Sequence, residues 1–77
     1  MKKVKVYSTS TCPYCKMLKD FLQGKNVAFE NMDVGENHEA AKEMKEKSGQ
    51  FGVPVVDIEG KIIVGFDKEE ITRELGI

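Results

Sequence analysis

Hydrophobic and polar residues alternate at the start of the chain. In the segment 3–8, which has the sequence KVKVYS, Val4 and Val6 fall on one side and the lysines fall on the other, together with Tyr7. Alternation of this kind is typical of a β-strand, because successive side chains of a strand point to opposite faces. The pattern therefore predicts a first strand that ends near Ser8.

After a short turn at residues 9–11, apolar residues recur at helical spacing. Pro13 stands where a first helical residue is expected, because its ring fixes a helical φ angle and its missing N–H would have no helical partner there. The apolar positions that follow are Tyr14, Leu18, Phe21 and Leu22. We expect a first helix from Pro13 to Gly24, with Cys12 at its N-terminus.

The middle of the chain predicts a second strand and a second helix. The segment 26–34, NVAFENMDV, has two apolar pairs with a slip between them, which indicates a strand that bulges or ends early. Asn37 can cap the following helix and Gly49 can stop it. Its narrow apolar stripe consists of Ala40, Ala41 and Met44. The surrounding charged residues predict a solvated face, on which Glu43 and Lys47 have the i, i+4 spacing of a helical ion pair.

The last third predicts a hairpin and a short helix. The segment 53–66, VPVVDIEGKIIVGF, holds two runs rich in Val and Ile that Glu59 and Gly60 separate, which is typical of a β-hairpin. Asp67 and Glu70 then have the spacing of a capping box, so a last helix should begin there.

The predicted order of elements is β-α-β-α-β-β-α. A strand, a crossover helix and a second strand imply a parallel pair, and the closing hairpin adds two more strands. We therefore expect an α/β protein with one four-stranded mixed sheet flanked by helices. A chain of 77 residues without linkers or repeats makes a single domain over residues 1–77.

Composition and charge narrow the class of partner. The chain is 40% hydrophobic and 32% charged, with a formal net charge of -1 and interspersed signs. This gives no basic patch for nucleic acid or for a membrane surface. No stretch has the apolar length of a membrane span or of a secretory signal. We expect a cytoplasmic monomer that binds neither nucleic acid nor membranes.

The chain has two cysteines, Cys12 and Cys15, three positions apart. A Cys-x-x-Cys beside a βαβ pattern is a signature of a thioredoxin-like redox motif. At a helix N-terminus a sulfur can accept hydrogen bonds from free N–H groups and lies at the positive end of the helix dipole, which favours the thiolate. Lys16 can add to this effect. We expect Cys12 to attack a disulfide and the less exposed Cys15 to resolve the mixed disulfide.

Two other uses of the cysteines are weaker. A structural disulfide over so short a loop removes little entropy from the unfolded chain, and a cytosolic disulfide would not persist in a mesophile. A zinc site needs about four ligands, and beyond the cysteines the chain offers only His38 and carboxylates. We expect no metal site within one chain. An iron–sulfur cluster or metal held by Cys12 of two chains, with glutathione, remains the alternative function.

Pro54 stands where a strand should begin. A proline there is either an ordinary strand-start residue or part of a cis Val53–Pro54 bond that faces the cysteines. In the second case, the Val53 backbone is free to pair with an extended substrate.

The segments TCPYCK, GVPVV and IVGFDKEEI together resemble the glutaredoxin family over essentially the whole chain. The similarity includes the short glutaredoxin-like proteins that donate electrons to ribonucleotide reductase. It implies a thioredoxin-like fold, Cys12 as nucleophile, Cys15 as resolving thiol and Pro54 in the cis form. The residues that it places along a groove for glutathione or a protein disulfide are Tyr14, Gln50, Val53, Gly65 and Asp67, and Lys16 is added as a candidate contact. Packing, loop or capping roles are the alternatives for these groove residues.

The chain departs from many glutathione-using members of that family at three places. Thr9 stands where they carry a basic residue, Phe51-Gly52 stands where they carry Arg-Thr, and Phe66 replaces the second residue of a Gly-Gly pair. A glutathione carboxylate would lose a charge-assisted contact worth roughly 1.5–3 kcal/mol, or about tenfold to a hundredfold in affinity. Lys16, Lys19 and Asp67 are the residues that could compensate.

The expected function is that of a dithiol–disulfide oxidoreductase in electron transport and cell redox homeostasis. It would reduce protein disulfides or glutathione mixed disulfides through a reversible Cys12–Cys15 disulfide. We expect no tightly bound cofactor. Glutathione, as co-substrate, or thioredoxin reductase would supply the electrons.

Overall fold

The computed structural model describes residues 3–77 and contains the predicted order of elements. They are β1 (Val4–Ser8), α1 (Pro13–Gly24), β2 (Glu30–Asp33), α2 (His38–Ser48), β3 (Val55–Ile58), β4 (Lys61–Val64) and α3 (Lys68–Leu75). The sheet order is β2-β1-β3-β4, with β1 parallel to β2 and the other neighbours antiparallel. The predicted four-stranded mixed sheet is therefore confirmed. Within the described residues, none of the helices is long and apolar enough to span a membrane.

Short-range signals in the sequence place most of the element ends. Asn37 caps α2 by accepting hydrogen bonds from two backbone N–H groups at 3.0 and 3.1 Å. Gly49 ends α2 in the left-handed conformation, with φ of 76°, and Asp67 caps α3. Glu59 and Gly60 have φ of 49° and 97° in the turn between β3 and β4. Positive φ at both central residues matches the right-handed twist of a hairpin, which explains a glycine there.

The second strand is shorter than the segment 26–34 that the apolar alternation predicted. β2 begins only at Glu30. Val27 instead closes the turn after α1, where its N–H donates a hydrogen bond to the Leu22 carbonyl at 2.9 Å. Val27 also packs against the core beneath α1. Its apolar character therefore reflects packing of the loop rather than strand pairing.

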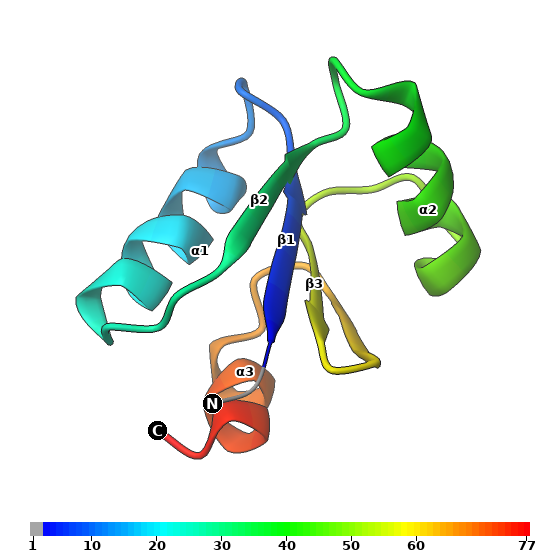
Figure 1. Cartoon of the computed structure of the whole chain (residues 1–77). Helices are drawn as coiled ribbons and strands as arrows, with labels where there is room; N and C mark the ends of the chain where they lie inside the picture. The colour runs from blue at the N-terminus through cyan, green and yellow to red at the C-terminus, as the bar shows by residue number, and fades with distance from the viewer. Residues whose placement is uncertain (1–2) are drawn as a thin grey trace.

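Each face of the sheet carries a hydrophobic cluster. The cluster on the side of α1 and α3 consists of Val4, Val6, Leu18, Leu22, Val56, Ile58, Ile63 and Ile71. The cluster on the side of α2 consists of Tyr7, Met44 and Val55. Figure 1 shows α1 and α2 on opposite sides of the sheet. The alternation placed Tyr7 with the polar residues, but its side chain is 0% exposed. Both faces of β1 are therefore covered.

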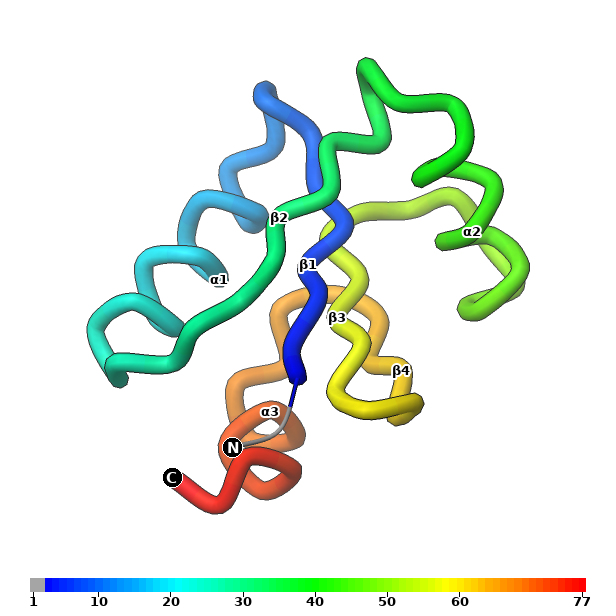
Figure 2. The backbone as a smooth tube through the Cα atoms, in the orientation of Figure 1, coloured from blue at the N-terminus to red at the C-terminus, as the bar shows by residue number. Residues whose placement is uncertain are grey.

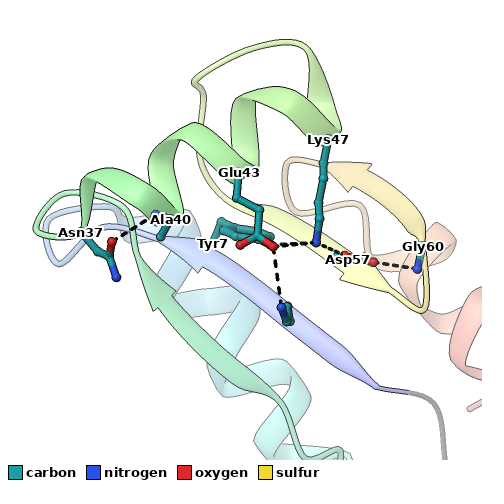
Figure 3. Close-up of polar contacts among 8 residues, drawn as sticks. Tyr7, Asn37, Ala40, Glu43, Lys47, Asp57 and Gly60 are labelled. Atoms are coloured by element: carbon teal, nitrogen blue, oxygen red, sulfur yellow. Dashed lines mark hydrogen bonds and ion pairs between the residues drawn. The ribbon is translucent and has the colours of Figure 1, made fainter.

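A partly buried polar group, which we call the Lys47 cluster (Lys5, Tyr7, Glu43, Lys47 and Asp57), joins α2 to the sheet (Figure 3). Lys47 Nζ lies 2.6 Å from Asp57 Oδ2 and donates a hydrogen bond to Tyr7 Oη at 3.0 Å. It also lies 3.3 Å from Glu43 Oε1, so the predicted helical ion pair forms. Lys42, Lys45, Glu46 and Lys47 are exposed, in agreement with the predicted solvated face. The sequence did not predict that Lys47 also reaches across to Asp57 on β3.

The charges of the Lys47 cluster stabilise one another. Burial by itself lowers the pKa of Lys47, but its hydrogen bonds to Asp57 and Tyr7 outweigh this and raise the pKa above its usual range. Burial likewise raises the pKa of Asp57, but hydrogen bonds from Lys47 and the Gly60 N–H outweigh this and lower it. Because the Asp57 side chain is only 11% exposed, removing Lys47 would leave a nearly buried carboxylate without its main partner.

Replacing Lys47 by methionine tests this role, because Lys47→Met removes the cation and keeps most of the apolar stem. We expect the free energy of unfolding, measured by urea denaturation, to fall by about 1.5–3 kcal/mol, less than for a fully buried pair because Lys47 is partly exposed. Lys42→Met, at an exposed position of the same helix, is the matched control and should change stability by less than about 0.5 kcal/mol. Equally small losses in both variants would contradict the role of Lys47.

Candidate active site

Cys12 and Cys15 lie at the N-terminal end of α1, where the loop from β1 enters the helix. Cys12 is the N-cap residue, with an extended backbone (φ -95°, ψ 112°), and Pro13 follows at the start of the helix. The Cys15 N–H donates a hydrogen bond to Cys12 Sγ at 3.2 Å. The sulfur thus takes the place of the oxygen that usually satisfies a free donor of the first turn. Both thiols are free.

The two thiols differ in their surroundings. Cys12 is partly exposed, whereas Cys15 is 0% exposed. Burial, and after it the hydrogen bond with Cys12, raises the pKa of the Cys15 thiol to about 11, although a backbone hydrogen bond from Thr9 and the charge of Lys19 act in the opposite direction. At neutral pH Cys15 is therefore a buried, protonated thiol. Cys12 is the sulfur that a second molecule can reach.

The Val53–Pro54 peptide bond is cis, which is the form that the resemblance implied. Val55, the next residue, pairs with Tyr7 across the sheet, so this bond lies at the end of β1 from which the chain runs on to Cys12 (Figure 2). The Pro54 carbonyl accepts a hydrogen bond from the Gly65 N–H at 2.7 Å. Pro54 is buried and Val53 is half-buried. Pairing between strands thus brings Val53, Pro54 and Gly65 together.

Of three other predicted contact residues, two make local contacts and the third is exposed. Lys16 Nζ donates a hydrogen bond to Asp20 Oδ2 at 3.0 Å on the exposed side of α1. Asp67 accepts a hydrogen bond from the Glu70 N–H at 3.1 Å, so its carboxylate caps α3. Tyr14 is 63% exposed, beside the cysteines in sequence. Of these three, Tyr14 has the side chain that is most open to a second molecule.

The Gln50 side chain forms hydrogen bonds within its own loop. Its Nε2 donates hydrogen bonds to Ser48 Oγ at 3.2 Å and to the Gly52 carbonyl at 3.1 Å. Its Oε1 accepts a hydrogen bond from the Gly52 N–H. The amide group therefore fixes the path of the segment that leads to Pro54, and a substrate contact by Gln50 would compete with these bonds.

Two exposed apolar side chains have no predicted role in the site: Met17 was not singled out from the sequence, and Phe51 was noted only as a departure from the family. Met17 is 50% exposed and lies three residues after Tyr14, on the same side of α1. Phe51, just before the cis bond, is 62% exposed, and Lys45 Nζ lies 5.4 Å from the centre of its ring. The sequence does contain a signal for both residues. Met17 falls outside the apolar stripe of α1 and Phe51 lies in a loop, and apolar side chains at such positions are expected to be exposed.

Comparisons with known proteins agree with this geometry. The sequence model of the glutaredoxin family matches residues 4–63. An uncharacterized glutaredoxin-like 8.6 kDa protein in the rubredoxin operon of Clostridium pasteurianum is 47% identical over 70 residues, which cover 91% of this chain and 93% of that protein. Glutaredoxin 3 of Escherichia coli strain K12 is 36% identical over 67 residues, which cover 87% of this chain and 81% of that protein.

The fold also has a solved counterpart. The crystal structure of a mutant of the thioredoxin-like protein BC3987 matches with a TM-score of 0.93 and 35% identity, over 100% of this chain and 99% of that chain. The predicted thioredoxin-like fold is thereby confirmed. A family match over most of the chain, with relatives this similar, shows that the chain belongs to the glutaredoxin family, whose members are thiol–disulfide oxidoreductases.

Proposed function

We propose that this protein reduces disulfides with both of its cysteines, Cys12 as the attacking thiol and Cys15 as the resolving thiol. The observation that carries the proposal is the contrast between the two sulfurs. Cys12 is reachable at the N-cap of α1, whereas Cys15 is buried one helical turn further on. A disulfide from outside can therefore meet only the first sulfur, and the second can act only on a bond that already includes Cys12.

Two exchange steps follow from this arrangement. The Cys12 thiolate attacks one sulfur of a substrate disulfide, and the other sulfur leaves as a thiolate and takes up a proton from water. Cys15 then loses its proton to water and attacks Cys12 Sγ, which expels the second substrate sulfur. The substrate gains two electrons, and the protein keeps a Cys12–Cys15 disulfide that an external thiol reductant must open.

The exposed surface around the cysteines favours extended peptide substrates. Tyr14, Met17 and Phe51 offer apolar area that a peptide flanking a disulfide can cover. The half-buried Val53 lies next to the cis bond, where its backbone can pair with an extended chain. We assign Val53, Pro54 and Gly65 to this peptide-binding part of the site.

Glutathione is a poorer fit than a peptide, because its carboxylates need cations. Lys16 is engaged with Asp20, Gln50 with its own loop, and Asp67 repels a carboxylate. Thr9 offers no charge at the place where many glutathione-using relatives have a basic residue. We therefore propose protein disulfides as the main substrate class and thioredoxin reductase as the main electron source.

The alternative of a cluster or metal carrier stays a prediction. Among residues 3–77, no three His, Cys, Asp or Glu side chains are grouped so that they could hold a metal ion. A cluster shared between two chains would use Cys12 alone from each. Brown colour and visible absorbance after anaerobic purification would support that alternative.

Single serine variants separate the roles of the cysteines. Cys12→Ser should lower the rate of disulfide reduction at least about a hundredfold for every substrate, because no other thiol is accessible. Cys15→Ser should lose turnover of protein disulfides and accumulate a mixed disulfide on Cys12, which mass spectrometry detects. Cys15→Ser can keep reactions that need one thiol, such as removal of glutathione. Full activity of Cys15→Ser on a protein disulfide would contradict the resolving role.

A paired assay of NADPH consumption distinguishes the electron sources. One cuvette supplies glutathione and glutathione reductase, and the other supplies thioredoxin reductase. We expect turnover with thioredoxin reductase and at least about tenfold slower turnover with glutathione, because a charge-assisted contact is missing. Thr9→Lys, which restores the basic residue, should raise the glutathione-dependent rate selectively. Equal rates from both sources in the unmodified protein would contradict the proposed preference.

A further inference from the structure

We propose that Lys19 is a positioning residue for the resolving step, where its charge assists Cys15 to attack as a thiolate. The inference rests on the dithiol function proposed above. It concerns a side chain outside the Cys-x-x-Cys motif, which the sequence suggested only as a partner for a glutathione carboxylate. It answers a question that the burial of Cys15 raises, which is how a buried thiol can supply enough thiolate at neutral pH for the second exchange step.

Burial makes the second exchange step harder than the first. Cys15 is 0% exposed, and burial raises the pKa of its thiol to about 11. Only a thiolate attacks a disulfide, so the small thiolate fraction at neutral pH limits the step. A positive charge close to Cys15 enlarges that fraction, because it favours the charged form of the sulfur.

Helix geometry places Lys19 beside Cys15. The two residues are four apart on α1, which makes them neighbours on the same face of the helix. Lys19 is half-buried, and it takes part in none of the ion pairs found among residues 3–77. Lys16, the other lysine near the motif, is exposed and bound to Asp20 at 3.0 Å. Lys19 is therefore the cation that remains available to Cys15.

None of the other groups described around Cys15 supplies a positive charge that could stabilise its thiolate. Cys12 opposes the charge on Cys15, and a backbone hydrogen bond from Thr9 supports it. β1 presents the uncharged Val4 and Val6 to the face that α1 covers. The segment 49–54, which leads to the cis bond, has no titratable side chain.

Two carboxylates lie near this end of the sheet, and both are bound to backbone. Asp33, at the end of β2, accepts hydrogen bonds from the N–H groups of Gly35 and Glu36 at 2.9 and 3.2 Å. Asp67 caps α3. Because both carboxylates accept hydrogen bonds from backbone N–H groups, neither is paired with Lys19.

The assisted step is a thiol–disulfide exchange that needs no further reactant. Cys15 gives its proton to water, and the Cys15 thiolate attacks Cys12 Sγ in the mixed disulfide. The bond between Cys12 and the substrate sulfur breaks as the Cys12–Cys15 bond forms. The substrate sulfur leaves with the electron pair and takes up a proton from water.

An aromatic disulfide that releases a coloured thiolate lets the two steps be measured separately in one stopped-flow experiment. Attack by Cys12 on 5,5′-dithiobis(2-nitrobenzoate) releases a first coloured thiolate, and attack by Cys15 on the resulting mixed disulfide releases a second. The rate of the second release is followed from about pH 6 to pH 9, below and around the ordinary pKa of a thiol. The variants are Lys19→Gln, Lys19→Arg, which keeps the charge, and Lys42→Gln, at an exposed lysine of α2, as the control.

We expect Lys19→Gln to slow the second release about two- to fivefold at neutral pH and to shift its pH profile upward, a modest effect because water partly screens the charge. Lys19→Arg should restore the profile, and Lys42→Gln should leave it unchanged. A merely structural role of Lys19 would change the urea midpoint but would not move the pH profile.

Two results would overturn the role of Lys19. One is a second release whose pH profile in Lys19→Gln superimposes on that of the unmodified protein, and the other is a change confined to the first release. A failure of the dithiol function is recognised separately, because the unmodified protein would then show no second release at all. Cys15→Ser, which has no resolving thiol, gives the reference for that case.

Discussion

The entry of the chain into α1 is the constraint on which the site depends. Pro13 begins the helix, so Cys12 falls at the N-cap, where its sulfur accepts the Cys15 N–H at 3.2 Å. The helical turn that follows carries Cys15 into the interior, where it is 0% exposed. A single local geometry therefore gives one reachable sulfur and one protected sulfur. That asymmetry makes the order of the two exchange steps a consequence of structure.

The sheet and α2 hold this entry in place. Tyr7 pairs with Val55, which keeps the cis Val53–Pro54 bond beside the end of β1. Tyr7 is in turn fixed on the other face of the sheet, where its hydroxyl accepts a hydrogen bond from Lys47 at 3.0 Å. The Lys47 cluster thus stabilises the packing of α2 on the strand that leads to the cysteines, although it contributes no group to the chemistry.

The sequence correctly predicted the features of the fold that depend on residues close together along the chain. The start of α1 at Pro13, the cap at Asn37 and the hairpin turn at Gly60 all follow from local backbone requirements. It mispredicted the surroundings of Tyr7 and missed the contact of Lys47 with Asp57, because alternation cannot show that a second helix will cover the polar side of a strand. The local bonds of Gln50 likewise depend on the path of a loop, which no periodicity describes.

Treatment of the reduced protein with a limiting amount of glutathione disulfide tests most directly whether Cys12 and Cys15 work as a pair. The cysteine peptides are mapped by mass spectrometry over time. We expect a transient glutathione adduct on Cys12, followed by an intrachain Cys12–Cys15 disulfide and release of glutathione. A stable adduct on Cys12, or disulfides between two chains, would contradict the dithiol mechanism.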